Sequence, residues 1–184
     1  MTEHRPLAAA SPWVELVAST ADWDDADPAL LRAMLSQLVL IRTFEEYVLE
    51  LASAGLVHGP AHSSIGQEGG AVGSILPLTS ADAVTGSHRG HHQFLAKAFG
   101  HVMTPNSGSL PVLNDELRTV LRRTLAEICG LADGYCRGRG GSMHLQWRAA
   151  GAMATHALVG GGCAPAPRFA RTQACARALP AARP

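Results

Sequence analysis

The side chains best equipped for chemistry stand together in segment 87–92, which runs Ser-His-Arg-Gly-His-His. Imidazoles exchange protons near neutral pH, and a guanidinium offers a planar fork of donors that suits a phosphate group. A glycine among these residues lets a ligand approach the backbone closely. The cluster therefore predicts a site for phosphate binding or proton transfer, with a solvated polar loop as the alternative.

The composition limits the kinds of ligand that such a site can bind. The 184 residues carry 15 basic and 15 acidic side chains, and hydrophobic residues make up 47% of the chain. This balance indicates a globular domain and argues against binding to nucleic acid or to a membrane surface. Because the chain has no basic-then-apolar start and no apolar run of about 18 residues, we expect a cytoplasmic protein. Any phosphate site must then be built locally from a few donors.

The four cysteines do not form the close pairs that are typical of a zinc site. We therefore predict no metal-ligating residues in this chain. Cys129 and Cys136 lie near the end of an expected helix, where we expect them to be small buried hydrophobic residues.

A long helix is expected to support the cluster. Asp27 and Pro28 predict its start, because a carboxylate caps free backbone N–H groups and proline suits the first helical position. Apolar residues then recur with helical spacing as far as Ala54, and Gly55 suits the position after a helix end. We expect residues 1–27 to form a loosely ordered arm.

Shorter elements are expected to deliver the cluster itself. Segment 82–85 predicts a parallel strand that leads into the cluster at its carboxyl end, where α/β folds place ligands. The glycine-rich segment 158–162 predicts either close approach to a cofactor or an ordinary tight turn. The remaining expected elements are helices over 67–76, 92–100 and 115–132, the last capped by Asn114, and an exposed loop over 101–113.

Four segments in this order resemble the α subunit of the thiamine-diphosphate-dependent E1 components of 2-oxo acid dehydrogenase complexes. They are 40–46 (Leu-Ile-Arg-Thr-Phe-Glu-Glu), 62–68 (His-Ser-Ser-Ile-Gly-Gln-Glu), 87–91 (Ser-His-Arg-Gly-His) and 138–144 (Gly-Arg-Gly-Gly-Ser-Met-His). The similarity extends over about residues 30–162. Pyruvate, branched-chain and acetoin members of the family look alike in these segments, and four segments in order are far more specific than any one.

The resemblance implies an α/β fold, namely the three-layer thiamine-diphosphate-binding fold with a parallel sheet. Residues 28–162 would form its N-terminal and predominantly helical portion. Such α subunits act with an E1 β subunit, decarboxylate a 2-oxo acid or cleave acetoin, and pass the acyl group to a lipoyl group on an E2 component. The implied enzyme is an oxidoreductase whose cofactors are thiamine diphosphate and magnesium, and the cofactor's ring serves as the electron sink.

The resemblance also implies roles for individual residues. By motif match, Arg89 and His88 would bind the diphosphate, and His91 would be a catalytic residue near the reacting centre. His62 matches a catalytic histidine at the active-site entrance, with an ordinary capping or core histidine as the alternative. His92 departs from the glycine that is usual in the family. The positions matched to the surroundings of the cofactor's pyrimidine ring are Ala157, Val159 and Gly160.

The resemblance stops after the glycine-rich segment 158–162. The family's magnesium ligands come from a Gly-Asp-Gly segment and a later asparagine, but these 184 residues contain no Gly-Asp-Gly, and both asparagines lie upstream. Of the 22 residues in 163–184, 16 are Ala, Arg or Pro, and the prolines would interrupt a helix or a strand. We expect this tail to be an out-of-frame or truncated end, with a linker or disordered tail as the alternative.

Two further functions compete with that of a complete E1 α subunit. Without magnesium ligands we expect weak or absent cofactor binding by this chain alone, because a diphosphate needs the cation as well as Arg89. The chain would then be an inactive assembly module whose helix over 28–54 binds a β subunit. A simple phosphate-binding α/β domain would explain Arg89 and the glycines, but not the four ordered segments.

Overall fold

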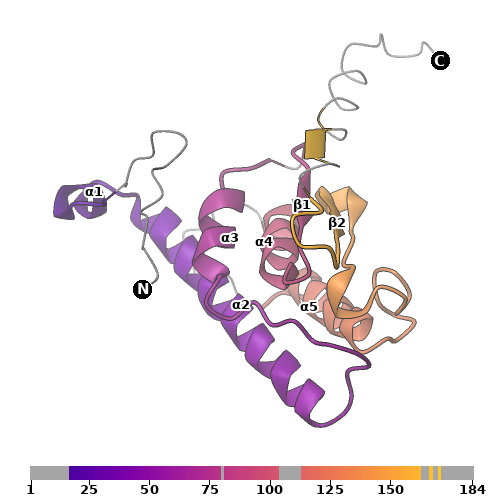
Figure 1. Cartoon of the computed structure of the whole chain (residues 1–184). Coiled ribbons are helices and arrows are strands. Elements are labelled where there is room, and N and C mark those ends of the chain that lie inside the picture. Colours follow the sequence, from indigo (N-terminus) through magenta and orange to yellow (C-terminus); the bar gives the residue numbers. More distant parts are fainter. Residues whose placement is uncertain (1–16, 80, 104–112, 163–165, 168–169, 171–184) are drawn as a thin grey trace, which may run out of the picture.

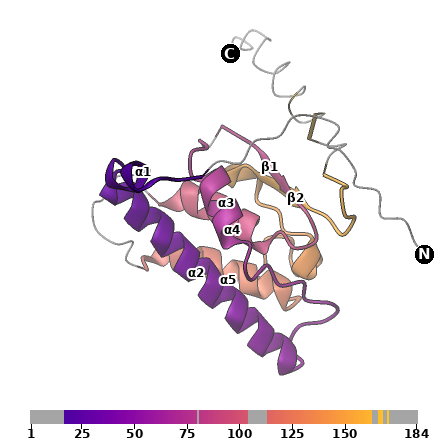
Figure 2. The ribbon, with the colours of Figure 1, turned by 60° about the vertical axis from the view of Figure 1, so that its left-hand side comes forward.

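Packed helices and one small parallel sheet make up the fold. The computed structural model describes residues 17–79, 81–103, 113–162, 166–167 and 170. Helix α2 (Pro28–Ser53) lies along one side, and α3 (Glu68–Ile75), α4 (His91–Val102) and α5 (Asp115–Ile128) pack beside it (Figures 1 and 2). The described part is thus rich in helix, which is consistent with the predicted α/β class, while the three-layer arrangement stays a prediction. No helix in these ranges combines the length and apolar character needed to cross a bilayer.

Helix α2 begins and ends as its local sequence predicts. The Asp27 carboxylate accepts a hydrogen bond from the backbone N–H of Ala29, and Pro28 occupies the first turn. At the other end the N–H of Leu56 donates to the carbonyl of Leu51, while Gly55 adopts a φ of +75°. This is the left-handed helix ending that glycine favours. The expected arm over 1–27 is not wholly irregular, because α1 (Thr20–Asp24) forms within it, and residues 1–16 lie outside the described ranges.

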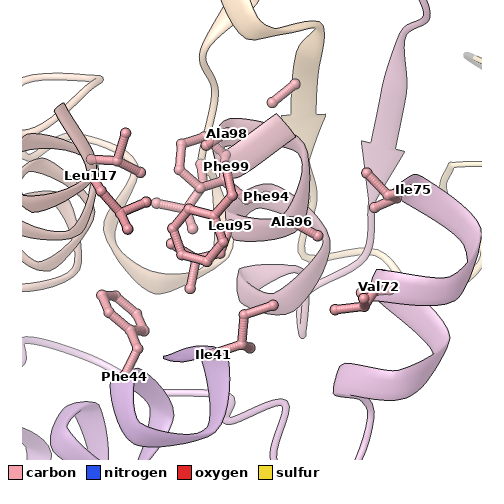
Figure 3. Close-up of a cluster of buried hydrophobic side chains, with 14 of the residues drawn as sticks. Ile41, Phe44, Val72, Ile75, Phe94, Leu95, Ala96, Ala98, Phe99 and Leu117 are labelled. Atoms are coloured by element: carbon pink, nitrogen blue, oxygen red, sulfur yellow. The ribbon is translucent and has the colours of Figure 1, made fainter. Parts of the chain in front are cut away.

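Helix α4 is the centre of the molecule. Eight of its twelve residues are buried, and it contacts α2, α3, α5 and both strands. Figure 3 shows its two phenylalanines between α2 and α5, with α3 on the other side. The cluster of buried apolar side chains includes Ile41, Phe44, Val72, Ile75, Phe94, Leu95, Phe99 and Leu117. An element that is apolar on most sides can only be stable in this enclosed position.

The two strands pair in parallel and lie against α4. Strand β1 (Val84–Gly86) pairs with β2 (Ala152–Thr155), so the prediction of a parallel strand at the cluster is confirmed with bounds shifted by one or two residues. Strand β2 was not predicted. Helix α4 covers the expected helix over 92–100 and extends to Val102, whereas most of the expected loop over 101–113 lies outside the described residues.

Helix α5 is shorter than predicted. The Asn114 side chain caps its start by accepting from the N–H of Leu117, as expected, but the helix ends at Ile128 rather than at residue 132. Gly130 has a φ of +74° and turns the chain back, an ending that glycine allows. The two cysteines beyond this end, Cys129 and Cys136, are only partly buried, so the expectation of buried cysteines was wrong.

A fully buried carboxylate organises the turn after α5. Glu127 accepts three backbone N–H groups, from Cys136 at 2.7 Å, Gly138 at 3.0 Å and Gly140 at 2.6 Å. These donors satisfy both carboxylate oxygens, as a buried anion requires. The turn packs so closely that a Cβ on Gly138, whose φ is +71°, would collide with the backbone of Gly130. The glycine-rich segment of the fourth motif is therefore a packing requirement as well as a possible ligand approach.

Gly138→Ala should lower the free energy of unfolding by about 3 kcal/mol, because the side chain adds a backbone collision to an unfavourable φ. Gly141→Ala is the matched control. It also has a positive φ, of +58°, but a Cβ added there would meet nothing within 4 Å, so we expect a loss of about 1 kcal/mol. Urea unfolding of both variants checks this, and equal losses would contradict it.

Candidate functional site

A buried hydrogen-bonded pair joins the predicted site to the long helix. The Nδ1 atom of His91 lies 2.7 Å from Oε1 of Glu45, and neither side chain is exposed. The other ring nitrogen, Nε2, lies 2.9 Å from both the carbonyl and the hydroxyl oxygen of Ser142. The second carboxylate oxygen of Glu45 accepts the backbone N–H of Ser64 at 2.9 Å. Each of these four residues comes from a different one of the four motif segments.

The Glu45 carboxylate is stabilised as an anion in this setting. Burial by itself raises its pKa, but the hydrogen bond and charge of His91, the N–H of Ser64 and the side chain of Ser63 together outweigh burial. The net pKa lies below the usual value, so the group is ionised at neutral pH. A buried anion facing an imidazole donor fixes the ring orientation of His91.

His91 itself is enclosed rather than presented to a ligand. Its exposed fraction is 0%, and both ring nitrogens are engaged by Glu45 and Ser142. The preceding turn is equally tight, because a Cβ on Gly90 would collide with Thr155. The catalytic role implied for His91 stays a prediction, and its observed contacts are those of an anchor for the turn.

Three other predicted site residues meet at the surface above this anchor. The guanidinium of Arg89 donates from Nη1 to the carbonyl of Ser63 at 2.5 Å. The rings of His62 and His88 contact edge to face, with centroids 5.0 Å apart. The backbone N–H of His62 also faces the Ser142 hydroxyl at 3.4 Å. Two histidines and an arginine, all half-buried, thus lie together, and the roles that the resemblance implies for them stay predictions.

Two histidine nitrogens in this region have no partner. The Nδ1 atoms of His88 and His92 are buried and make no hydrogen bond within the described part of the chain. Burial lowers the pKa of His92, so this imidazole is neutral at pH 7. His92, which stands where the family usually has glycine, is buried in the first turn of α4.

The predicted pyrimidine-side positions lie at the neighbouring strand end. Ala157, Val159 and Gly160 are exposed and follow β2, as His88 and Arg89 follow β1. Because the two strands are parallel neighbours, their carboxyl ends open on the same edge of the sheet (Figure 1). The structure brings His62, His88 and Arg89 into one group, and it places the three later positions at that edge of the sheet rather than within the group.

An ion pair, also not predicted, links the first two motif segments. Arg42 on α2 donates from Nε to Oε1 of Glu68 at 2.6 Å and from Nη2 to Oε2 at 3.2 Å. Glu68 also accepts the N–H of Gly66 at 3.0 Å. The Arg42 hydrogen bond lowers the pKa of Glu68 to about 2, against a smaller opposing effect of burial.

The sequence did contain a signal for the buried contact of Glu45. This acidic residue lies beside Phe44 and Val48 on the apolar face of the predicted helix, where a carboxylate needs a hydrogen-bond partner.

A cavity of about 450 Å³ lies elsewhere, at the far end of α4. Its walls include the rings of Tyr135 and Trp147, whose centroids are 5.1 Å apart, and burial raises the pKa of Tyr135 to about 12. None of the predicted site residues lines it; the lining residues are His101, Val102, Asp115, Glu116, Thr119, Val120, Arg123, Tyr135 and Trp147. The candidate site is therefore defined by the chemistry of its side chains and not by this cavity.

Glu68→Gln should destabilise the chain by about 1–2 kcal/mol at pH 7, because the amide loses the charge-assisted pairing with the partly exposed Arg42. Since the folded pKa of Glu68 is depressed from 4.5 to about 2, its stabilising effect is present above pH 4.5 and is lost as the pH falls toward 2. Urea unfolding of the unmodified chain and of Glu68→Gln at pH 7, 4.5 and 3 should show that the difference between their free energies of unfolding shrinks as the pH falls. A difference that does not change with pH would contradict this.

Comparison with known proteins gives the family. No family model matches the chain, but curated relatives do. The chain is 34% identical to the α subunit of an acetoin:2,6-dichlorophenolindophenol oxidoreductase from Bacillus subtilis. The aligned 148 residues are 80% of this chain and 36% of that subunit. It is 31% identical to the pyruvate dehydrogenase E1 component subunit α of Rhizobium meliloti. The aligned 124 residues are 67% of this chain and 30% of that subunit.

A third relative extends the comparison to plants. The chain is 29% identical over 133 residues, 72% of its length, to the mitochondrial pyruvate dehydrogenase E1 component subunit α of Pisum sativum, and covers 28% of it. The chain thus spans about a third of the length of the curated relatives it matches. The resemblance inferred from four short segments is confirmed: the chain belongs to the family of E1 α subunits of the pyruvate and acetoin dehydrogenases.

Proposed function

We propose that this chain supplies the α-subunit side of a thiamine-diphosphate site in a 2-oxo acid or acetoin dehydrogenase E1 component. The observation that carries the proposal is the convergence of His62, His88 and Arg89 on the Glu45–His91 anchor. Thiamine diphosphate, when bound, supplies the carbanion and electron sink that decarboxylation needs. The residues of this chain would bind, orient and shield that cofactor.

The donor set fits a diphosphate. Arg89 uses one of its N–H groups on Ser63, which leaves the rest of its fork for phosphate oxygens. Its neighbour His88 has an unpartnered buried Nδ1 atom that needs a polar partner. Helix α4 begins directly after them, and no side chain caps its N-terminus. The free N–H groups and the positive end of the helix dipole add to the attraction for an anion.

His62 would stand at the entrance of this site. Its ring already packs against His88, so a ligand held by His88 and Arg89 would lie within its reach. Its proposed role is to orient the substrate and exchange a proton with it. The exposed positions Ala157, Val159 and Gly160 would offer backbone groups to the pyrimidine ring from the adjacent strand end.

Magnesium does not fit the residues described. No group of three or more His, Cys, Asp or Glu side chains in the described ranges could hold a metal ion, and the sequence contains no Gly-Asp-Gly segment. No step of the proposal passes through a metal in this chain. The family's E1 β subunit, its lipoyl-bearing E2 component and a small 2-oxo acid remain proposed partners, and the cytoplasm remains the proposed location.

A second candidate function is that of an assembly module without catalysis. Helix α2 carries exposed apolar side chains on the side away from the core, including Leu35 at 59% and Val39 at 57% exposure. Apolar residues exposed one helical turn apart suit contact with a partner helix. Co-purification with a β subunit without cofactor binding would favour this module over the enzyme.

Arg89→Ala should weaken thiamine diphosphate binding at least roughly 10-fold in a complex of this chain with an E1 β subunit, since charge-assisted hydrogen bonds are lost. Arg122→Ala removes an exposed arginine from α5 and is the matched control, with an expected change below about 2-fold. Calorimetric titration with cofactor and magnesium measures both variants. Equal affinities of the Arg89 variant and the unmodified complex would contradict the proposed site.

The chain alone should bind thiamine diphosphate weakly, with a dissociation constant above about 1 mM, because the described residues provide donors for the diphosphate but no ligands for its cation. The same titration without a β subunit tests this. Micromolar affinity that depends on magnesium would overturn the expectation and would reveal metal ligands outside the described residues.

A further inference from the structure

The buried Glu45 carboxylate touches every motif segment other than its own, either directly or through one residue. It contacts Ser64 and His91 directly, and it reaches Ser142 through the ring of His91. We infer that Glu45 is a positioning residue for the diphosphate-binding groups, an inference that rests on the proposed function. It does not touch the ligand, but it determines where Arg89 and His88 stand.

Arg89 is held at both ends by this carboxylate. Its backbone lies two residues before His91, whose ring is fixed by Oε1 of Glu45 at 2.7 Å. Its guanidinium is oriented by the carbonyl of Ser63, and the next residue, Ser64, donates its N–H to Oε2 of Glu45 at 2.9 Å. One carboxylate therefore determines the separation between the arginine's backbone and the carbonyl that aims its side chain.

A carboxylate at this position fixes the proton of His91 on the ring nitrogen that faces it. The two oxygens of Glu45 face two donors, the Nδ1–H of His91 and the N–H of Ser64. A glutamine has one acceptor oxygen and one NH₂ group, so it can keep the N–H of Ser64 only by presenting its NH₂ group to His91, which requires the ring proton to move from Nδ1 to Nε2. A neutral hydrogen bond then replaces the charge-assisted one that the carboxylate accepts. Because Glu45 and His91 are 0% exposed, water cannot compensate for the lost charge-assisted contact.

The turn cannot adjust to such a loss without moving the site. Gly90 is packed against Thr155 so closely that a Cβ there would collide, and the His91 ring is held on its far side by Ser142. Rearrangement of the ring must therefore shift the Ser87–Gly90 turn, which carries His88 and Arg89. The lost contact would appear as a displaced or loosened anion site, beyond a general loss of stability.

The test compares Glu45→Gln with Val48→Ala in the full chain and in its complex with an E1 β subunit. Val48 is the matched control, because it is equally buried on the same face of α2 but belongs to the apolar core. Nitrogen-15 NMR of the histidine side chains reports the His91 Nδ1–H group, and amide hydrogen exchange reports the 87–90 turn. Calorimetric titration of the complexes with thiamine diphosphate and magnesium reports the site.

Glu45→Gln should change the His91 nitrogen signals, speed amide exchange at 87–90 beyond the loss of global stability, and weaken cofactor affinity roughly 10-fold. Val48→Ala should lower global stability, leave the His91 nitrogen signals unchanged and change the cofactor affinity by less than about 2-fold. Unchanged signals and affinity in Glu45→Gln, or equal effects in both variants, would overturn the inference alone. Failure of the unmodified complex to bind cofactor would overturn the proposed function, and this inference with it.

Discussion

Burial of helix α4 is the constraint on which the remaining structure depends. An element with eight buried residues has to be covered by α2, α3 and α5 on its sides and by the two strands. Its first residue, His91, is polar, and it enters the interior only because Glu45 and Ser142 satisfy its ring. The interior therefore combines an apolar centre with one charged contact at its rim, and the predicted ligand-binding residues stand directly above that rim.

This arrangement gives a physical reason for the joint occurrence of the four motif segments. Each supplies one member of a buried hydrogen-bonded set, so the loss of one member leaves the others without partners in a dry interior. The ion pair of Arg42 and Glu68 joins two of the segments a second time, closer to the surface. The segments that carry the resemblance to E1 α subunits are thus joined to one another inside the fold by their own side chains and backbone groups.

Local signals in the sequence predicted much of this fold. Asp27 and Asn114 each cap the helix that follows, because capping depends on a few adjacent residues. The end of α5 was missed because the apolar spacing continues past Ile128, while the buried Glu127 draws the chain into a turn. Strand β2 was missed because its four residues show no alternation and are defined by pairing with β1.

The sequence singled out candidate binding residues, but it did not reveal the contacts that support them. Arg89, His88 and His62 were singled out by residue type and motif match, and they do lie together. Glu45 was not, since its partner lies 46 positions away and only the fold brings them together. Residue type reveals which groups can bind a ligand, whereas the groups that hold them depend on tertiary contacts.

The two carboxylates with 0% exposure, Glu45 and Glu127, also differ in how far along the chain their partners lie. Glu127 binds groups 9, 11 and 13 residues away, and short loops of this length close rapidly. The contacts of His91 with Glu45 and Ser142 span 46 and 51 residues, and such distant pairs pay a larger loop-closure entropy. We therefore expect α5 and the turn after it to form early in folding, and the anchor beneath the proposed ligand-binding groups to form later.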